Sequence, residues 1–300
     1  MKFAIIGAGG LGGFFGARLA TAGHDVSFLA RGENLAALRR DGLTVLGPDG
    51  ATTLPVHATG DPADLGAADV ALLAVKTWQL DAAVAALPAG VDAVITTQNG
   101  VDAPAQVART LGRDAVLPGV AKVIAALTGP GTVRHVGGTG SLDIAEWDNR
   151  ATGRVERIRA AFGDAGIGTT APGDIWADLW AKFLFIAPAG GLGAVTGATF
   201  GALRDHPETR RTLHDAMAEI ERLARAAGVT LPAGVVDDTM AFFDRQPAEG
   251  TTSLQRDIAA GRPSELDAWT GAVVRLGRQA GVPTPVNDVL HAVLRLREDS

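Results

Sequence analysis

The most informative segment of this chain is Ile5-Ile6-Gly7-Ala8-Gly9-Gly10-Leu11-Gly12-Gly13. The apolar run before Gly7 predicts a buried parallel strand, and apolar and small residues recur at helical spacing from residue 11 to residue 20. Gly7, Gly9 and Gly12 match the G-x-G-x-x-G pattern. In it the first glycine permits a tight turn, the second admits a pyrophosphate and the third lets the helix approach the strand. We therefore expect a dinucleotide on this loop, bound by Gly7, Gly9, Gly10, Leu11 and Gly12. The alternative is a tight strand-to-helix turn without a ligand.

The end of the next expected strand, Val26 to Ala30, indicates which dinucleotide binds. An acidic residue about 20 residues past the motif is typical of NAD enzymes. Arg31 stands there instead, and a guanidinium suits the 2′-phosphate of NADP(H) because it donates two parallel hydrogen bonds. Glu33 follows Gly32 and is expected in the first turn of the next helix. We expect NADP(H); the alternative interpretation of Arg31 is a solvated charge at a strand end.

Composition limits the classes of protein to consider. Apolar residues make up 47% and charged residues 20% of the 300 residues, as in a folded globular protein with room for two domains. The net charge of −6 argues against binding to nucleic acid or to an anionic membrane surface. There is no cysteine, and the six histidines lack metal-ligand spacing, so no metal site is expected. The first strand begins at Lys2, which leaves no room for a signal peptide, so we expect a cytoplasmic protein.

Residues 24 to 125 alternate apolar strands with helical patterns, which predicts a doubly wound parallel sheet. Two of the expected strands, Val70–Val75 and Ala93–Thr97, lead to Lys76 and to Asn99. Ligands bind at the carboxyl ends of such strands, so Lys76 and Asn99 are expected at the same crevice as the glycine loop. Both are candidate cofactor contacts, and the alternative is that they are ordinary strand-end residues.

The pattern changes after residue 115. Three short antiparallel strands separated by glycine turns are expected at Leu117–Val123, Gly131–His135 and Ser141–Ile144, before a helix from about 154 to 165 and a short strand near 168–170. From residue 175 the pattern is helical, with segments at about 175–200, 205–228, 232–246, 251–260, 265–280 and 284–297. We predict an α/β fold with an N-terminal Rossmann-type doubly wound domain (residues 1–172) and a C-terminal all-α domain (residues 173–300). The active site is expected between the two.

One helical segment has the length of a membrane span. Phe183 to Leu203 is uncharged and 21 residues long, but it contains Pro188 and five glycines. Gly193, Gly197 and Gly201 recur at every fourth residue, a spacing that suits close helix contact in a membrane or in a buried helix. We expect a buried central helix and no membrane insertion, and the glycine-lined helix favours a homodimer.

Lys182 is the one charge between Asp178 and Arg204, in a helix that otherwise has a buried pattern. Burial disfavours a charged ammonium, which suits a general acid that protonates a carbonyl oxygen as hydride arrives at carbon. The alternative is a lysine at the helix edge that reaches solvent. Pro263 and Ser264 predict a helix start that places Glu265 in its first turn, where a carboxylate either acts in the site or only complements the helix dipole. Ser253 is a candidate helix cap.

Taken together, these residues resemble the ketopantoate reductases (2-dehydropantoate 2-reductases) nearly from end to end. The matching stretches occur in the family's order and at its separations, and they are the glycine loop, Ala30-Arg31-Gly32, Val75-Lys76-Thr77-Trp78-Gln79, Gln98-Asn99-Gly100, Trp180-Ala181-Lys182, Ser253 and Gly261-Arg262-Pro263-Ser264-Glu265-Leu266-Asp267. The resemblance implies a Rossmann domain, a helical domain and NADPH-dependent reduction of ketopantoate to pantoate, a reaction of pantothenate biosynthesis.

The resemblance also implies roles for single residues. Lys182 resembles the general acid, and Glu265 resembles the carboxylate that holds the hydroxyl side of the substrate and the position of the lysine. Ser253 resembles the serine that hydrogen-bonds the substrate carboxylate. Arg31 matches the contact to the 2′-phosphate, whereas Lys76 and Asn99 match cofactor or active-site contacts.

The chain departs from the family where asparagines normally follow the lysine by one and two helical turns. Ile186 and Gly190 occupy these substrate-facing positions, on the same helix face as Lys182, so the pocket wall is expected to be apolar. Each missing hydrogen bond to substrate costs on the order of 1 kcal/mol. NADPH-dependent reduction of a 2-oxo acid, with ketopantoate first, is the leading expectation. A related reductase for a bulkier or more apolar oxo compound, which Ile186 and Gly190 favour, and a non-catalytic NADPH-binding sensor are the alternatives.

Overall fold

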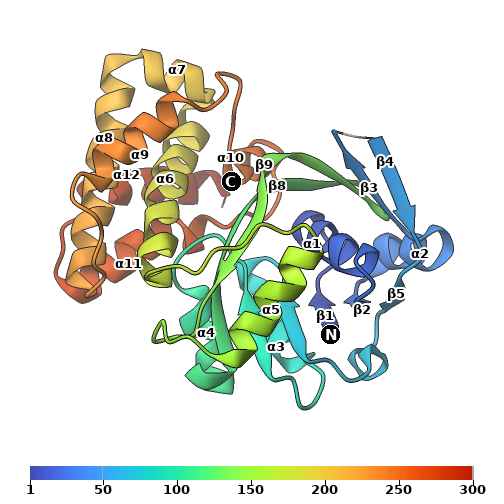
Figure 1. Cartoon of the computed structure of the whole chain (residues 1–300). Helices are drawn as coiled ribbons and strands as arrows, with labels where there is room; N and C mark the ends of the chain where they lie inside the picture. Colours follow the sequence, from blue (N-terminus) through green and yellow to red (C-terminus); the bar gives the residue numbers. More distant parts are fainter. Residues whose placement is uncertain (49, 299–300) are drawn as a thin grey trace. The chain divides into compact units, whose positions relative to one another are not determined.

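The computed structural model of the chain describes residues 1–48 and 50–298. The chain forms two compact units, one of Met1–Gln98 with Ala103–Ile175 and the other of Asn99–Asp102 with Trp176–Ser300. The first unit is a sheet with helices and the second is helical (Figure 1), which confirms the predicted fold class. The short segment Asn99–Asp102 belongs to the helical unit although it follows a strand of the sheet.

The sheet of the first unit has nine strands among the described residues, in the order β4-β3-β9-β8-β7-β6-β1-β2-β5. Its strands are β1 (Lys2–Ile6), β2 (Asp25–Leu29), β3 (Leu43–Gly47), β4 (Gly50–Leu54), β5 (His57–Thr59), β6 (Val70–Leu73), β7 (Ala93–Thr96), β8 (Val116–Gly129) and β9 (Thr132–Ile144). The helices of this unit are α1 (Gly10–Thr21), α2 (Gly32–Asp41), α3 (Leu80–Ala85), α4 (Ala103–Leu111) and α5 (Gly153–Asp164), with short 3₁₀ turns η1 (Pro62–Leu65), η2 (Thr77–Gln79) and η3 (Arg113–Ala115).

Strand β1 lies at the point where the order of the parallel strands reverses. It pairs in parallel with β2 on one side and with β6 on the other, so that Ile6 lies opposite both Leu29 and Leu73. In doubly wound sheets, ligands bind outside the carboxyl ends of the strands at this switch point. The topology therefore places the glycine loop, which follows β1, where a ligand crevice is expected.

Helices cover both faces of the sheet, and the side chains of β1 point alternately into the two cores that result. Phe3 and Ile5 belong to a core that also contains side chains of α1 and α5. Ala4 and Ile6 belong to a second core, which contains side chains of α3 and α4. The strand is thus buried on both faces, which explains its continuous apolar sequence.

The expectation of antiparallel strands between residues 117 and 144 is confirmed, but the expected division into three short strands is wrong. Strands β8 and β9 form one long antiparallel hairpin that pairs from Gly119 opposite Ile144 to Gly129 opposite Thr132. The register shifts between Lys122 and Val123 and again between Ile124 and Ala125. Gly138 and Gly140, which suggested turns, have φ of 80° and 69° and lie where the hairpin bulges. The expected strand near residue 168 is a single bridge to Ser141.

The second unit consists of helices, which begin and end close to the predicted segments. They are α6 (Ile175–Thr196), α7 (Phe200–Asp205), α8 (Pro207–Ala226), α9 (Val235–Asp244), α10 (Ser253–Ala259), α11 (Thr270–Ala280) and α12 (Pro285–Glu298), with the 3₁₀ turn η4 (Leu266–Ala268). Helix α7 was not expected as a separate element.

Helix α6 is long and apolar enough to cross a membrane, but 67% of its most apolar window is buried inside the protein, as in the core helix of a soluble protein. The expectation of one continuous glycine face is wrong. Gly193 lies in α6 and faces Gln255 of another helix. Gly197 follows the end of α6 with φ of 72°, and Gly201 lies in α7, where it packs against Ala248.

Candidate active site

Each glycine of the G-x-G-x-x-G motif has its own geometric reason. Gly7 has φ of +103°, and a Cβ there would lie 2.8 Å from Cγ1 of Val75. A Cβ on Gly12 would lie 2.0 Å from the carbonyl oxygen of Gly7, so only glycine lets α1 start this close to the strand. A Cβ on Gly9 would meet no atom within 4 Å. No side chain caps the start of α1, so the first N–H groups of the helix face the open space beside Gly9. This arrangement fits a pyrophosphate.

Gly10 and Leu11 pack against other parts of the sheet unit. A Cβ on Gly10 would lie 2.4 Å from the carbonyl oxygen of Ala125 in β8, so the long hairpin requires a glycine here. Leu11 is half-buried and packs on the core shared by β1, α1 and α5. Their assignment to the cofactor stays a prediction.

Asn34, which no sequence motif marks, fixes the glycine loop. Its Nδ2 donates to the carbonyl oxygen of Ala8 at 2.9 Å, and its Oδ1 accepts from the backbone N–H of Gly131 at 2.8 Å. One side chain of α2 therefore holds both the loop and the turn of the β8–β9 hairpin. Its two partners are 26 and 97 residues away in sequence, which is why no local pattern marks it.

Arg31 lies directly before α2, in extended conformation, with an exposed side chain. The prediction that Glu33 lies in the first turn of this helix is confirmed. Because this guanidinium is exposed just past the end of β2, it can reach a ligand and suits an anionic group of that ligand.

The carboxyl ends of β6 and β7 are fixed by the side chain of Gln98, for which the sequence alone predicts no separate role. Nε2 of Gln98 donates to the carbonyl oxygens of Leu73 and Val75 at 2.8 and 3.0 Å, and the hydroxyl of Thr97 donates to Leu73 at 2.7 Å. Lys76 follows at the start of η2, with its Nζ 5.9 Å from the centre of the Trp78 ring.

Lys182, Ile186 and Gly190 lie on one face of α6 in the helical unit. Lys182 and Ile186 are half-buried, whereas Gly190 is buried. A Cβ on Gly190 would lie 2.5 Å from Cζ3 of Trp269 and 3.3 Å from Cδ2 of Leu254. The end of this face is therefore where the start of α10 and the turn after η4 meet α6.

Glu265 is 6% exposed and stands immediately before η4. The expectation of an α-helix beginning at Pro263 and Ser264 is corrected, because a 3₁₀ turn comes first and α11 starts only at Thr270. The carbonyl oxygen of Glu265 accepts the N–H groups of Ala268 and Trp269 at 3.0 and 3.1 Å. The tight turn thus fixes the backbone that carries this carboxylate.

The interpretation of Ser253 as a helix cap is wrong. Thr252 is the cap of α10, since its hydroxyl accepts the N–H of Gln255 at 3.2 Å. Ser253 is the first helical residue and is half-buried. Its role toward substrate stays a prediction.

Asn99 belongs to the same unit as Lys182, Ser253 and Glu265. Its neighbour Gly100 has φ of +115°, and a Cβ there would lie 2.8 Å from the carbonyl oxygen of Ala268. Asp102 forms an ion pair with Arg275 of α11. The helical unit therefore holds the Asn99 segment against the turn that begins at Glu265. The glycine loop, Arg31 and Lys76 belong to the sheet unit.

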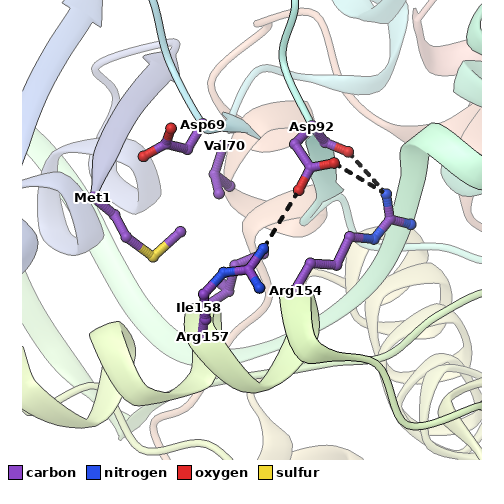
Figure 2. Close-up of a pocket in the computed structure, with 7 residues that line it drawn as sticks. All are labelled: Met1, Asp69, Val70, Asp92, Arg154, Arg157 and Ile158. Atoms are coloured by element: carbon purple, nitrogen blue, oxygen red, sulfur yellow. Dashed lines mark hydrogen bonds and ion pairs between the residues drawn. The ribbon is translucent and has the colours of Figure 1, made fainter.

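A hollow of about 180 Å³ lies at the opposite edge of the sheet, next to the amino ends of β1, β6 and β7 (Figure 2). Its charged walls include Asp92 and Arg154, and Arg154 also forms an ion pair with Glu146 at 2.6 Å. Burial opposes ionisation of Glu146, but the hydrogen bonds from Arg154 and Thr152 outweigh it and hold the pKa of the carboxyl below its usual value. This hollow lies at the amino ends of the strands, whereas the glycine loop lies at their carboxyl ends.

Within residues 1–48 and 50–298, no group of three His, Asp or Glu side chains is placed to hold a metal ion.

Comparison with known proteins agrees with this architecture. The family model described as ketopantoate reductase PanE/ApbA matches residues 3–149, and the model of its C-terminal domain matches residues 174–298. A 2-dehydropantoate 2-reductase of Halobacterium salinarum is 34% identical over 303 residues, which cover 99% of each chain. The crystal structure of a PanE/ApbA family ketopantoate reductase from Ralstonia eutropha JMP134 has a TM-score of 0.91 at 34% identity, covering 100% of this chain and 99% of that one. A D-mandelate dehydrogenase solved with NADH and anilino(oxo)acetate has the same fold, with a TM-score of 0.90 at 21% identity.

The fold and the glycine loop define a dinucleotide-binding protein of two units, and the family match makes it an oxidoreductase. Its family is equally clear, since the two models together match most of the chain and the relatives match it nearly from end to end. The chain belongs to the ketopantoate reductase family.

Proposed function

We propose that the protein reduces a 2-oxo acid with NADPH, and that the substrate is ketopantoate and the product pantoate. One observation carries the proposal. Around Gly190, two helical turns beyond Lys182 on α6, Leu254, which follows Ser253 in α10, and Trp269, from the turn that follows Glu265, pack against the helix. A proton donor, a hydroxyl and a carboxylate on converging elements are what reduction of a carbonyl beside a carboxylate requires.

The sheet unit supplies residues that fit NADPH. The open space at Gly9 and the uncapped start of α1 suit the pyrophosphate, and the exposed guanidinium of Arg31 suits the 2′-phosphate. When bound, NADPH supplies the hydride. Lys76 at the start of η2 is a further candidate for the cofactor's phosphates.

In the proposed reaction, Lys182 donates a proton to the carbonyl oxygen of the oxo acid. The hydroxyl of Ser253 donates a hydrogen bond to the substrate carboxylate, and Glu265 accepts one from the substrate hydroxyl. Asn99 contributes an amide from the segment that packs on the Glu265 turn. Ile186 forms an apolar wall between Lys182 and Gly190. This apolar wall supports the second candidate, a reductase for a more apolar oxo compound.

A homodimer in the cytoplasm completes the proposal. Val289, Val293 and Leu296 are 62%, 39% and 70% exposed and follow one another on one face of α12. A ketopantoate reductase from Staphylococcus aureus that shares the fold at 23% identity is described as dimeric. Light scattering of the purified protein tests the oligomeric state.

The activity is tested by following NADPH oxidation with ketopantoate and with a panel of other 2-oxo acids. We expect Lys182→Ala to reduce kcat by about 10²- to 10⁴-fold, the usual contribution of a general acid, with NADPH affinity unchanged. Lys2→Ala is the matched control, because Lys2 is exposed at the amino end of β1. Failure of the wild type to turn over ketopantoate refutes the substrate. Failure with every oxo acid, with NADPH still bound, supports a sensor instead.

A further inference from the structure

Trp269 fills the place that a side chain at position 190 would take. It is 1% exposed, and its Cζ3 and Cε3 atoms lie 2.5 and 2.8 Å from where a Cβ of Gly190 would be. Contacts under 3.0 Å are closer than van der Waals packing tolerates, so no side chain fits at residue 190 while the indole stays in place. The glycine therefore does not widen the pocket, because the indole occupies the space.

The indole is held there by its neighbours on both sides in sequence. A Cβ on Gly191 would lie 2.9 Å from Cγ2 of Thr270, and the carbonyl of Ala268 lies against Gly100. Both Ala268 and Trp269 donate their N–H groups to the carbonyl oxygen of Glu265. Trp269 is thus a rigid part of the same turn that carries Glu265, whose carboxylate is a candidate contact to substrate.

Along α6, Gly190 follows Lys182 by eight residues, or about 12 Å of helix. The half-buried Ile186 lies between them on the same face. The face that begins at the candidate proton donor is therefore apolar in the middle and closed by an indole at its end. A substrate that lies along this face would therefore meet the indole beyond Ile186.

We propose that Trp269 is the side chain that sets substrate size in this enzyme, and that it restricts the site to 2-oxo acids with compact side chains. The proposal rests on the proposed function. It assigns to the indole the exclusion of aryl and long-chain oxo acids, for which an exposed glycine at residue 190 would leave room.

The test compares kcat/KM for a compact 2-oxo acid, 2-oxoisovalerate, and a bulky one, benzoylformate, with NADPH. A hydrophobic pocket discriminates about tenfold or more per methylene, so Trp269→Ala is expected to raise the benzoylformate-to-2-oxoisovalerate ratio by at least about tenfold. Trp269→Phe keeps an aromatic ring against Gly190 and is the matched control, expected to retain the wild-type ratio. Its loss of the indole N–H is tolerable because Nε1 has no hydrogen-bond partner in the described part of the chain.

Trp269→Leu provides a second, milder truncation if the alanine variant does not fold, and NADPH binding reports the integrity of the sheet unit. Added indole provides a readout besides turnover, because it is expected to raise the Tm of Trp269→Ala and to leave that of the wild type unchanged. A folded Trp269→Ala or Trp269→Leu variant with an unchanged ratio overturns the proposal. A wild type that reduces none of the oxo acids overturns the proposed function first, and the two failures are therefore distinct.

Discussion

Replacing Asn34 by alanine should loosen the glycine loop. Asn34→Ala removes the hydrogen bond from Nδ2 to Ala8 at 2.9 Å and the one from Gly131 to Oδ1 at 2.8 Å. A hydrogen bond of this kind contributes about 0.5–1.5 kcal/mol, so the two together stabilise the loop and hairpin by about 1–3 kcal/mol. At about 2–4 °C per kcal/mol in a protein of this size, the Tm should fall by several degrees.

The same change should weaken NADPH binding, because the loop must be ordered again when the pyrophosphate binds. If the whole loss appears in binding, the Kd for NADPH rises by about 5- to 150-fold, since 1.4 kcal/mol corresponds to a factor of ten. Titration followed by the fluorescence of NADPH measures the Kd, and calorimetry measures the Tm.

Asn149→Gly is the matched control. Asn149 also makes two side-chain hydrogen bonds, to Asp174 and from Ile175, both at 2.9 Å, and glycine accepts its φ of 61°. This variant should lose stability without a change in the Kd for NADPH. An Asn34→Ala variant that binds NADPH as tightly as the wild type would refute the role given to Asn34, whatever its Tm.

Three further outcomes are expected. Arg31→Ala should reduce the preference for NADPH over NADH by about 10- to 150-fold, the worth of a charged hydrogen-bonded contact of about 1.5–3 kcal/mol, as measured by the ratio of kcat/KM values; an unchanged ratio would assign Arg31 to solvent. Thr252→Ala should lower the free energy of unfolding by about 1 kcal/mol in denaturant unfolding, because it removes the cap of α10. Ser253→Ala should leave that free energy unchanged and raise KM for the oxo acid. The reverse pattern would restore Ser253 as the cap. The pKa of Glu146 is lower in the folded protein than in the unfolded chain, so its pair with Arg154 contributes stability at neutral pH that is lost as the pH falls through the carboxyl range; Glu146→Gln should therefore flatten the decline of Tm between neutral and acid pH, and an unchanged slope would count against this pair.

Much of the fold was predictable because its signals are local. The apolar run before Gly7, the helical spacing after Leu11 and the strands at β2, β6 and β7 depend on neighbours a few residues away, and they are found where they were expected. The glycines between residues 135 and 141 predict a turn but form a bulge, because a glycine at positive φ suits a bulge as well as a turn. Only the pairing of β8 with β9 distinguishes the two.

For the candidate site, residue types and their spacing indicate the candidate groups, which are the glycine loop, Arg31, Lys182, Ser253 and Glu265. Which side chains hold these residues in place, and which space beside them is filled, depends on tertiary contacts. Asn34 holds a carbonyl 26 residues away, and Trp269 covers Gly190 from another element. The physical reason is that hydrogen bonds and excluded volume act over a few ångströms in space, at any distance along the chain, and no local pattern of residue types encodes them.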